Sequence, residues 1–188
     1  MSDTITAIAP LTGTYDLDPA HSRLGFVARH AMVTKVRGQF RDVTGTLHLD
    51  EADPSRSSAE VEIQVASLTT AQDQRDEHLR GADFFDAGQH PTITFRSTQA
   101  ERVDDDTYRL TGDLTIKGVT RPVSIDVEHT GAATDPFGNF RTGFEGRVQV
   151  NRRDWGLTWN VALDAGGLLV SDKVTLELDV SAVKRAEA

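Results

Sequence analysis

The sequence predicts an all-β protein of about eight or nine antiparallel strands, interrupted by one or two short helices. Apolar and polar residues alternate along most of the chain, so one face of each strand is expected to be buried. Turn-forming residues separate the alternating stretches. This pattern fits a closed barrel and a two-sheet sandwich equally well, because both bury one face of each strand. With 188 residues, the chain can form one core or one lined cavity.

The predicted strands begin at Tyr15 and continue to the end of the chain. The clearest alternation covers residues 59–65, where apolar residues alternate with Glu60, Glu62 and Gln64. In chain order, the positions expected on the buried faces are Leu24, Phe26, Ala28, Val36, Gly38, Phe40, Val43, Gly45, Leu47, Leu49, Ala59, Val61, Ile63, Val65, Ile93, Phe95, Tyr108, Leu110, Gly112, Leu114, Ile116, Val123, Ile125, Val127, His129, Phe140, Thr142, Phe144, Gly146, Val148, Val150, Val174, Leu176, Leu178 and Val180.

Turns are predicted where Asp, Pro and Gly gather between these strands. They lie at Asp18-Pro19, Asp53-Pro54-Ser55, Asp104-Asp105-Asp106, Lys117-Gly118-Val119-Thr120 and Asp135-Pro136-Phe137-Gly138. Residues 152–169 show no regular alternation and are rich in aromatic residues and leucine. We expect an irregular connection there, before the closing strand.

One helix is predicted over the helix-forming residues that precede Gly81, which is expected to end it in the left-handed conformation. Phe84 and Phe85 follow in a short connection, and a strand starts near Thr92. Two large rings in a connection indicate that it fills apolar space. We therefore expect this segment to close part of the sheet structure.

Composition narrows the function classes. The net charge is −9 and no block of Lys or Arg stands out, so nucleic acid is not expected as a partner. The chain has no cysteine, which excludes disulfides and thiolate metal sites. No stretch approaches the roughly 20 apolar residues of a membrane span. The N-terminus lacks the basic and apolar regions of a secretory signal, so a cytoplasmic protein is expected.

Several long motifs resemble the YceI-like family of lipid and polyisoprenoid binders. They are Tyr15-Asp16-Leu17-Asp18-Pro19-Ala20-His21-Ser22, Arg75-Asp76-x-His78-Leu79-x-x-x-Asp83-Phe84-Phe85-Asp86, Pro91-x-Ile93-x-Phe95-x-Ser97-Thr98, Gly112-Asp113-Leu114-Thr115-Ile116-Lys117-Gly118-Val119-Thr120-Arg121-Pro122-Val123 and Asn151-Arg152-x-Asp154-Trp155-Gly156-Leu157. The resemblance implies a lipocalin-like up-and-down β-barrel, and so favours the barrel over the sandwich. It also implies a homodimer. We expect a flexible tail over residues 1–13 and one barrel domain over residues 14–184.

The resemblance implies that the ligand is a long polyisoprenoid, such as an isoprenoid quinone or a polyprenyl diphosphate. We expect it to be held inside the barrel by a carrier, storage or transport protein. Gly45, Gly112 and Gly146 fall on the buried faces, where they either leave room for a ligand or mark bends. The candidate ligand-binding residues are Phe26, His30, Phe40, Leu47, Ile63, His78, Phe84, Phe85, Phe95, Leu114, Ile125, Phe144, Trp155, Leu157 and Trp159.

Two alternatives remain at this point. Asp76 and His78 could form the acid–base pair of an enzyme acting on such a lipid, although no nucleophile–base pair is evident. The barrel could instead be filled and serve as a ligand-free interaction module. No metal site is expected, because His21, His30 and His78 lack the spacing of a compact metal motif. No cofactor or catalytic role is expected either.

Two further features have several possible roles. Arg37, Arg41, Arg80 and Arg152 are candidates for a charged lipid head, although alternation places Arg37 and Arg41 on the outer face. The apolar run 161–170 could be a lid over the barrel, a membrane-facing surface or a dimer contact. We favour the lid, because the run follows both tryptophans and leads into the last strand.

Overall fold

The structure is a computed structural model that describes residues 10–186 of the chain. Within that range it contains eleven strands, one α-helix and four short 3-10 helices. The strands are β1 (Gly13–Leu17), β2 (Arg23–His30), β3 (Thr34–Phe40), β4 (Val43–Leu49), β5 (Ser58–Gln64), β6 (Leu68–Thr69), β7 (Thr92–Arg102), β8 (Thr107–Ile116), β9 (Val119–Thr134), β10 (Phe140–Asn151) and β11 (Lys173–Lys184). The helices are η1 (Pro19–His21), η2 (Pro54–Arg56), η3 (Val65–Ser67), α1 (Asp73–Arg80) and η4 (Arg152–Trp155).

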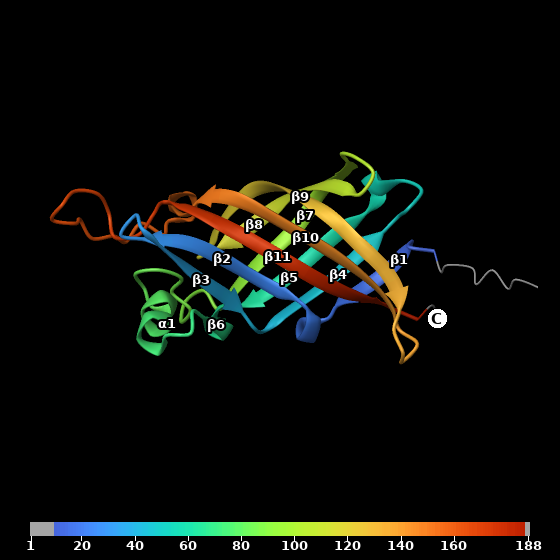
Figure 1. Ribbon diagram of the computed structural model, residues 1–188, viewed down its shortest axis with the longest axis horizontal. Helices are drawn as coiled ribbons and strands as arrows, with labels where there is room; N and C mark the ends of the chain where they lie inside the picture. Colours follow the sequence, from blue (N-terminus) through green and yellow to red (C-terminus); the bar gives the residue numbers. More distant parts are fainter. Residues whose placement is uncertain (1–9, 187–188) are drawn as a thin grey trace, which may run out of the picture.

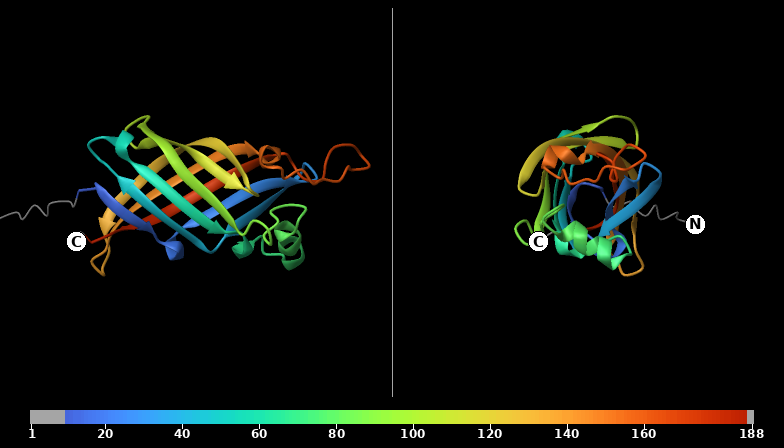
Figure 2. Two further views of the ribbon diagram at one scale, coloured as in Figure 1. Left: turned by 180° about the vertical axis from the view of Figure 1, so that it is seen from behind. Right: turned by 90° about the vertical axis from the view of Figure 1, so that its left-hand side faces the viewer.

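Eight strands close into an antiparallel barrel, which confirms the predicted architecture. The ring runs through β1, β4, β5, β7, β8, β9, β10 and β11, and the pairing of β11 with β1 completes it. The right-hand view of Figure 2 shows the ring along the length of the molecule. Closure pairs strand edges that an open sheet would leave exposed.

The hairpin formed by β2 and β3 extends this wall at one end. The first part of β11 pairs with β2, with Leu176 opposite Phe26, whereas its last residues pair with β1. β3 then pairs with the two-residue strand β6, which leads into α1. Figure 1 shows β3, β6 and α1 grouped at one end of the molecule, with β1 and the C-terminus at the other.

The turn between β8 and β9 illustrates how local sequence fixes strand pairing. Lys117 and Gly118 have φ angles of 50° and 73°, and Ile116 pairs directly with Val119. Two central residues with positive φ are typical of the tight turn whose twist matches antiparallel strands. The turn predicted at this position is therefore confirmed.

The helix α1 is anchored to the segment before it through its buried carboxylate. Asp76 is 3% exposed and accepts hydrogen bonds from the Thr70 hydroxyl and, at 2.7 Å, from the Thr70 amide. Arg75 Nε donates to the Thr70 hydroxyl oxygen at 2.7 Å, and Arg80 Nη2 donates to the Leu68 carbonyl at 2.6 Å. These contacts hold α1 against residues 68–70, which include β6.

The conformation predicted for Gly81 is wrong. Gly81 does follow the last residue of α1, but its φ of −74° and ψ of 177° are those of an extended backbone. The chain turns back further along, where the Ala87 amide donates to the Arg80 carbonyl and Asp86 has a φ of 51°. The left-handed residue is thus Asp86, after the Phe84-Phe85 pair.

Part of the expected N-terminal tail, residues 1–9, lies outside the described residues. Of the remainder, Gly13 is the first residue of β1, and the Tyr15 hydroxyl donates to the Leu11 carbonyl at 2.6 Å. At the other end, Lys184 is the last residue of β11 and its Nζ donates to the Pro10 carbonyl at 2.7 Å. Among residues 10–186, no helix is long and apolar enough to cross a membrane.

A candidate ligand cavity inside the barrel

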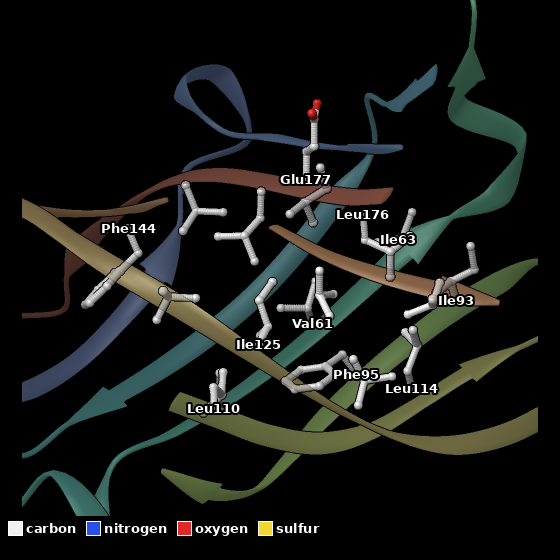
Figure 3. Close-up of a pocket in the computed structure, with 18 of the residues that line it drawn as sticks. Val61, Ile63, Ile93, Phe95, Leu110, Leu114, Ile125, Phe144, Leu176 and Glu177 are labelled. Atoms are coloured by element: carbon white, nitrogen blue, oxygen red, sulfur yellow. The ribbon is translucent and has the colours of Figure 1, made fainter. Parts of the chain in front are cut away.

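The barrel encloses an apolar cavity of about 340 Å³. It is lined by side chains from β2, β3, β4, β5 and β7 to β11, and by Leu79 of α1. Figure 3 shows Val61, Phe95, Leu114 and Ile125 gathered around it from different strands. This volume is at the lower end of the range for small-molecule sites, roughly 300–1,000 Å³.

Several inward-pointing side chains are only half-buried, although the barrel wall surrounds them. Val61, Ile63, Phe95 and Leu178 belong to this group. In a filled core, packing at the density of an organic crystal would bury such residues almost completely. Their residual exposure indicates that they face open space inside the barrel.

Aromatic rings close the cavity at the α1 end. The Phe85 ring lies 5.9 Å from the Phe40 ring and 6.3 Å from the Phe26 ring, measured between centroids. Phe84, beside it, is 5% exposed and also lines the cavity. The prediction that the two rings of the connection fill apolar space is confirmed.

Residues 152–157 complete the wall near the same end. The Trp155 ring is 2% exposed and its indole N–H donates to the Leu114 carbonyl at 2.9 Å. Arg152 is 6% exposed and donates to the carbonyls of Leu157 and, at 3.0 Å, Ser171. Burial lowers the pKa of the Arg152 guanidinium, while nearby Asp172 opposes the shift. Arg152 therefore fastens this segment through backbone carbonyls.

The polar residues of the cavity lining lie mainly in segments 50–58 and 108–109, and Figure 1 shows these segments at the end far from α1. Arg109 forms a two-pronged ion pair with Asp126, with N–O distances of 2.7 and 3.0 Å. The hydrogen bond and charge of Asp126 raise the pKa of Arg109. The polar members of the lining here are Asp50, Glu51, Ser57, Ser58, Tyr108 and Arg109.

Twelve of the fifteen candidate ligand-binding residues line the cavity. They are Phe26, Phe40, Leu47, Ile63, Phe84, Phe85, Phe95, Leu114, Ile125, Phe144, Trp155 and Leu157. Sequence reasoning missed Leu79 of α1 as well as Leu110, Val148, Leu176 and Leu178. Strand alternation places the four strand residues on inner faces, so alternation alone could have identified them as lining residues.

His30, His78 and Trp159 are not among the lining residues. His30 is the last residue of β2, beyond the part of the strand that lines the cavity, and its side chain is exposed. The His30 backbone forms a β-bridge with Val170. The His78 ring stacks edge-on against Trp159, with centroids 4.7 Å apart, and its Nε2 lies 2.9 Å from Asp83. These contacts form a second aromatic layer outside Phe84, so a direct ligand contact by these three residues stays a prediction.

Of the two interpretations of Gly112 and Gly146, the structure does not support the one in which they leave room for a ligand. A Cβ on Gly112 would lie 2.5 Å from the Phe95 ring and from the Arg96 carbonyl. A Cβ on Gly146 would lie 2.8 Å from the Asp126 carbonyl. Neighbouring rings and strands already occupy the space beside these glycines. Next to Gly112, the pairing of β7 with β8 shifts by one residue, as expected at a β-bulge.

Asp76 and His78 do not form an acid–base pair with each other. The Asp76 carboxylate is directed at Thr70, whereas His78 pairs with Asp83. Burial raises the pKa of Asp76, but hydrogen bonds from Thr70 and Thr69 and the charge of Arg80 outweigh it and lower the pKa overall. Across residues 10–186, no cluster of three or more His, Asp or Glu side chains is arranged to hold a metal ion.

The apolar run 161–170 does not cover the cavity as the favoured lid hypothesis required. Only Val170 of this run lines the cavity. Leu163 and Gly167 pair in a small ribbon that projects beyond the barrel (Figure 1). Arg37 of β3 and Arg41, which directly follows β3, line a surface groove and not the cavity, as alternation predicted.

The family model described as YceI-like domain matches residues 15–182. The chain belongs to the YceI-like family. A UPF0312 protein of Pseudomonas paraeruginosa is 34% identical to this YceI-like chain over 182 residues, which cover 96% of the chain and 92% of the relative.

Solved structures show the same YceI-like fold. BcnA of Burkholderia cenocepacia aligns with a TM-score of 0.76 and 25% identity, covering 88% of this chain and 98% of that one. A protein described as a polyisoprenoid binding domain from Saccharophagus degradans, implicated in plant cell wall breakdown, aligns with a TM-score of 0.66. It is 17% identical and the alignment covers 91% of this chain and 98% of that one, so this likeness shows the fold alone.

Proposed function

We propose that this protein binds a long-chain polyisoprenoid lipid inside its barrel and acts as a carrier, storage or transport protein for it. The observation that carries the proposal is the apolar cavity of about 340 Å³ inside the barrel. The description of the Saccharophagus degradans domain as polyisoprenoid-binding is consistent with the proposal.

The apolar lining favours a ligand that is held mainly by its hydrocarbon tail. Each buried CH₂ group contributes roughly 0.8 kcal/mol, so a few five-carbon units supply more than typical binding requires. Ordering the flexible tail offsets much of this gain. We therefore expect affinity to depend on tail length and to vary little with the head group.

The charged groups at the cavity favour a neutral head group, such as that of an isoprenoid quinone, over a diphosphate. The half-exposed Arg109 side chain pairs with Asp126 on the outward side of β8 and β9, and Arg152 is held by backbone carbonyls and by Asp172. Asp50 and Glu51 also contribute to the lining, and their carboxylates would repel a diphosphate. Binding of a diphosphate would require at least one of these arginines to change partner.

The alternatives of an enzyme and of a filled module receive less support from the geometry. Asp76 is buried on the face of α1 that contacts Thr70, and His78 lies outside the cavity lining, so neither points at a bound tail. A filled interaction module would have no enclosed space of this size. A homodimer and a cytoplasmic location remain predictions that light scattering and cell fractionation can test.

Organic extraction of the purified protein, followed by mass spectrometry, tests the proposal. We expect a co-purified lipid with a branched apolar tail. Leu110→Trp should lower the amount of lipid, because the larger ring would occupy the cavity that Leu110 lines. Asp113→Trp is the matched control, since Asp113 is exposed on the same strand.

Thermal unfolding must show that both tryptophan variants are folded. Equal lipid content in Leu110→Trp and Asp113→Trp would rule out the cavity as the binding site. Conversion of the extracted lipid by the wild-type protein, absent from His78→Ala, would instead favour the enzyme.

A further inference from the structure

An exposed apolar surface lies at the end of the molecule next to α1. Met32 and Val33, in the turn between β2 and β3, are 58% and 76% exposed, and Val161 is 47% exposed. We call these three residues the apolar tip. Figure 1 shows the β2–β3 turn and the ribbon that contains Val161 projecting from the same end.

Backbone pairing fixes the two parts of the apolar tip to each other. The Ala31 amide donates to the Leu169 carbonyl at 2.7 Å, and the Leu169 amide donates to the Val161 carbonyl at 2.9 Å. Met32 has a φ of 63°, a left-handed conformation that is unfavourable for most residues with a side chain. The turn thus holds an apolar side chain in solvent at a conformational cost.

A basic surface adjoins the apolar tip along the same hairpin. Residues 19–41 contain five Lys and Arg but no Asp or Glu, in a chain with 29 acidic and 20 basic residues. A surface groove is lined by five basic residues, which we call the basic face: Arg23, Lys35, Arg37, Arg41 and Arg75.

The basic face is only partly neutralised within the described residues. Arg37 pairs with Glu177 at 3.5 Å, and Arg75 is bound to Thr70. The side chains of Lys35 and Arg41 have no ion pair or hydrogen bond in residues 10–186. Concentrated positive charge without internal partners attracts an anionic surface.

Strand pairing adds to this positive charge. Arg29 lies directly opposite Lys35 in the β2–β3 register. Like charges directly opposite each other destabilise an antiparallel pair. Arg29 also donates to the Val33 carbonyl at 3.2 Å, and an anionic partner would relieve the repulsion between Arg29 and Lys35.

We propose that this end of the protein docks on an anionic lipid bilayer. The apolar tip enters the interface, and the basic face lies against the head groups. Peripheral membrane binding combines burial of a few apolar side chains with attraction of Lys and Arg to anionic lipids. Both components occur here on one hairpin, in a protein whose net charge of −9 would otherwise oppose the interaction.

A second copy of the chain fits this surface less well than a bilayer does. In a symmetric dimer, the same patch contacts its own copy across the two-fold axis. The basic face of one protomer would then approach the basic face of the other, and like charges in contact are unfavourable. The charge distribution therefore favours a lipid surface as the occupant.

The docking end is also the end that the Phe84-Phe85 pair closes. If the proposed function holds, a lipid tail could pass between bilayer and cavity at this end. Docking itself does not depend on a cavity ligand, so it can be tested separately.

The test is sedimentation of the full chain with vesicles that contain no isoprenoid. We expect binding to vesicles of phosphatidylglycerol and phosphatidylcholine, weakening at high salt, and little binding to phosphatidylcholine alone. Met32→Asn with Val33→Ser should reduce binding at least tenfold, and Asn tolerates the left-handed conformation at position 32. Lys35→Gln with Arg41→Gln should reduce it about 25-fold, or about fivefold for each charge.

Two control variants test whether these losses are specific to the docking end. Phe137 is 89% exposed in the β9–β10 turn at the other end of the barrel, and Arg96 is an exposed residue on β7. Phe137→Ser and Arg96→Gln should bind vesicles as the wild type does. Circular dichroism and lipid extraction should show that all four variants remain folded with unchanged cavity lipid.

The proposal is overturned if the wild type does not bind anionic vesicles. It is also overturned if Phe137→Ser loses as much binding as the Met32 and Val33 double variant. A change of oligomeric state in the tip variants, without vesicle binding by the wild type, would assign the surface to a second copy. Vesicle binding by a protein that yields no cavity lipid would refute the proposed function alone.

Discussion

The ring of Phe85 stands edge-on to the ring of Phe40, with centroids 5.9 Å apart and planes at 84°. Phe85 belongs to the connection after α1, and Phe40 is the last residue of β3. The contact therefore joins the helical connection to the barrel wall and closes the cavity at this end. Edge-to-face aromatic pairs add about 0.5–1.5 kcal/mol to the burial of the rings.

Replacing Phe85 with Ala should open this closure. We expect faster exchange of the cavity lipid and a fall of about 2–4 kcal/mol in the free energy of unfolding, because a large ring is lost from apolar surroundings. Lipid exchange can be followed by release into acceptor vesicles, and stability by urea unfolding. Phe137→Ala should change neither by much, since Phe137 is 89% exposed. Unchanged exchange in Phe85→Ala would show that lipid passes elsewhere.

Gly112→Ala should destabilise the barrel rather than reduce its capacity for lipid. The added Cβ would lie 2.5 Å from the Phe95 ring and the Arg96 carbonyl, so the wall must shift. Overpacking of this kind costs about 1–3 kcal/mol. Gly88→Ala is the control, because nothing lies within 4 Å of the Cβ it would add. A stable Gly112→Ala protein with less lipid would show instead that Gly112 leaves room for the ligand.

Asp76→Ala should loosen α1 from the barrel. The substitution leaves the buried Thr70 amide and hydroxyl without their acceptor, which costs about 1–3 kcal/mol. Hydrogen exchange should show α1 opening before the strands. Glu77→Ala, at an exposed neighbouring position on the same helix, should leave exchange unchanged. Equal protection of α1 in both variants would contradict the anchoring role of Asp76.

The sequence predicted the barrel because strand alternation is a local property. Ile63, Leu114 and Ile125 were placed in the interior by period-two alternation alone, and the structure has them lining the cavity. Leu79 was missed because its role depends on where α1 docks, which no local pattern records. The two interpretations of Gly112 could not be separated, because the Phe95 ring that covers it comes from a neighbouring strand.

Long-range pairing explains the remaining errors. Arg152 was a candidate for a head group, but its carbonyl partners Leu157, Val170 and Ser171 come together only when β11 returns to the barrel. The ribbon around Val161 has the composition of a core segment, yet its pairing with Ala31 and His30 carries it outward. Hydrophobicity indicates that such a run is buried somewhere, but does not identify its partner.

The ion-pair cluster around Arg141 should make stability depend on pH in the acid range. Arg141 forms ion pairs with two carboxylates. One is Asp18, which precedes η1, and the other is Asp135 in the β9–β10 turn, at 2.7 Å. Hydrogen bonding from Arg141 is the largest cause that lowers the pKa of Asp18 from 3.8 to about 2, against the opposing effect of burial. The same guanidinium lowers the pKa of Asp135.

Because the folded-state pKa of Asp18 is lowered, its contribution is fully present above pH 3.8 and is lost as the pH falls through about 2. Arg141→Gln should therefore lower the free energy of unfolding by about 1–2 kcal/mol at neutral pH, and the difference from wild type should shrink toward pH 2. Urea unfolding of both proteins between pH 2 and pH 7 measures this difference in the free energy of unfolding. Arg96→Gln removes an exposed pair with Glu60 and should cost little at any pH. If Arg141→Gln and wild type lost stability in parallel as the pH fell, the cluster would have no part in acid sensitivity.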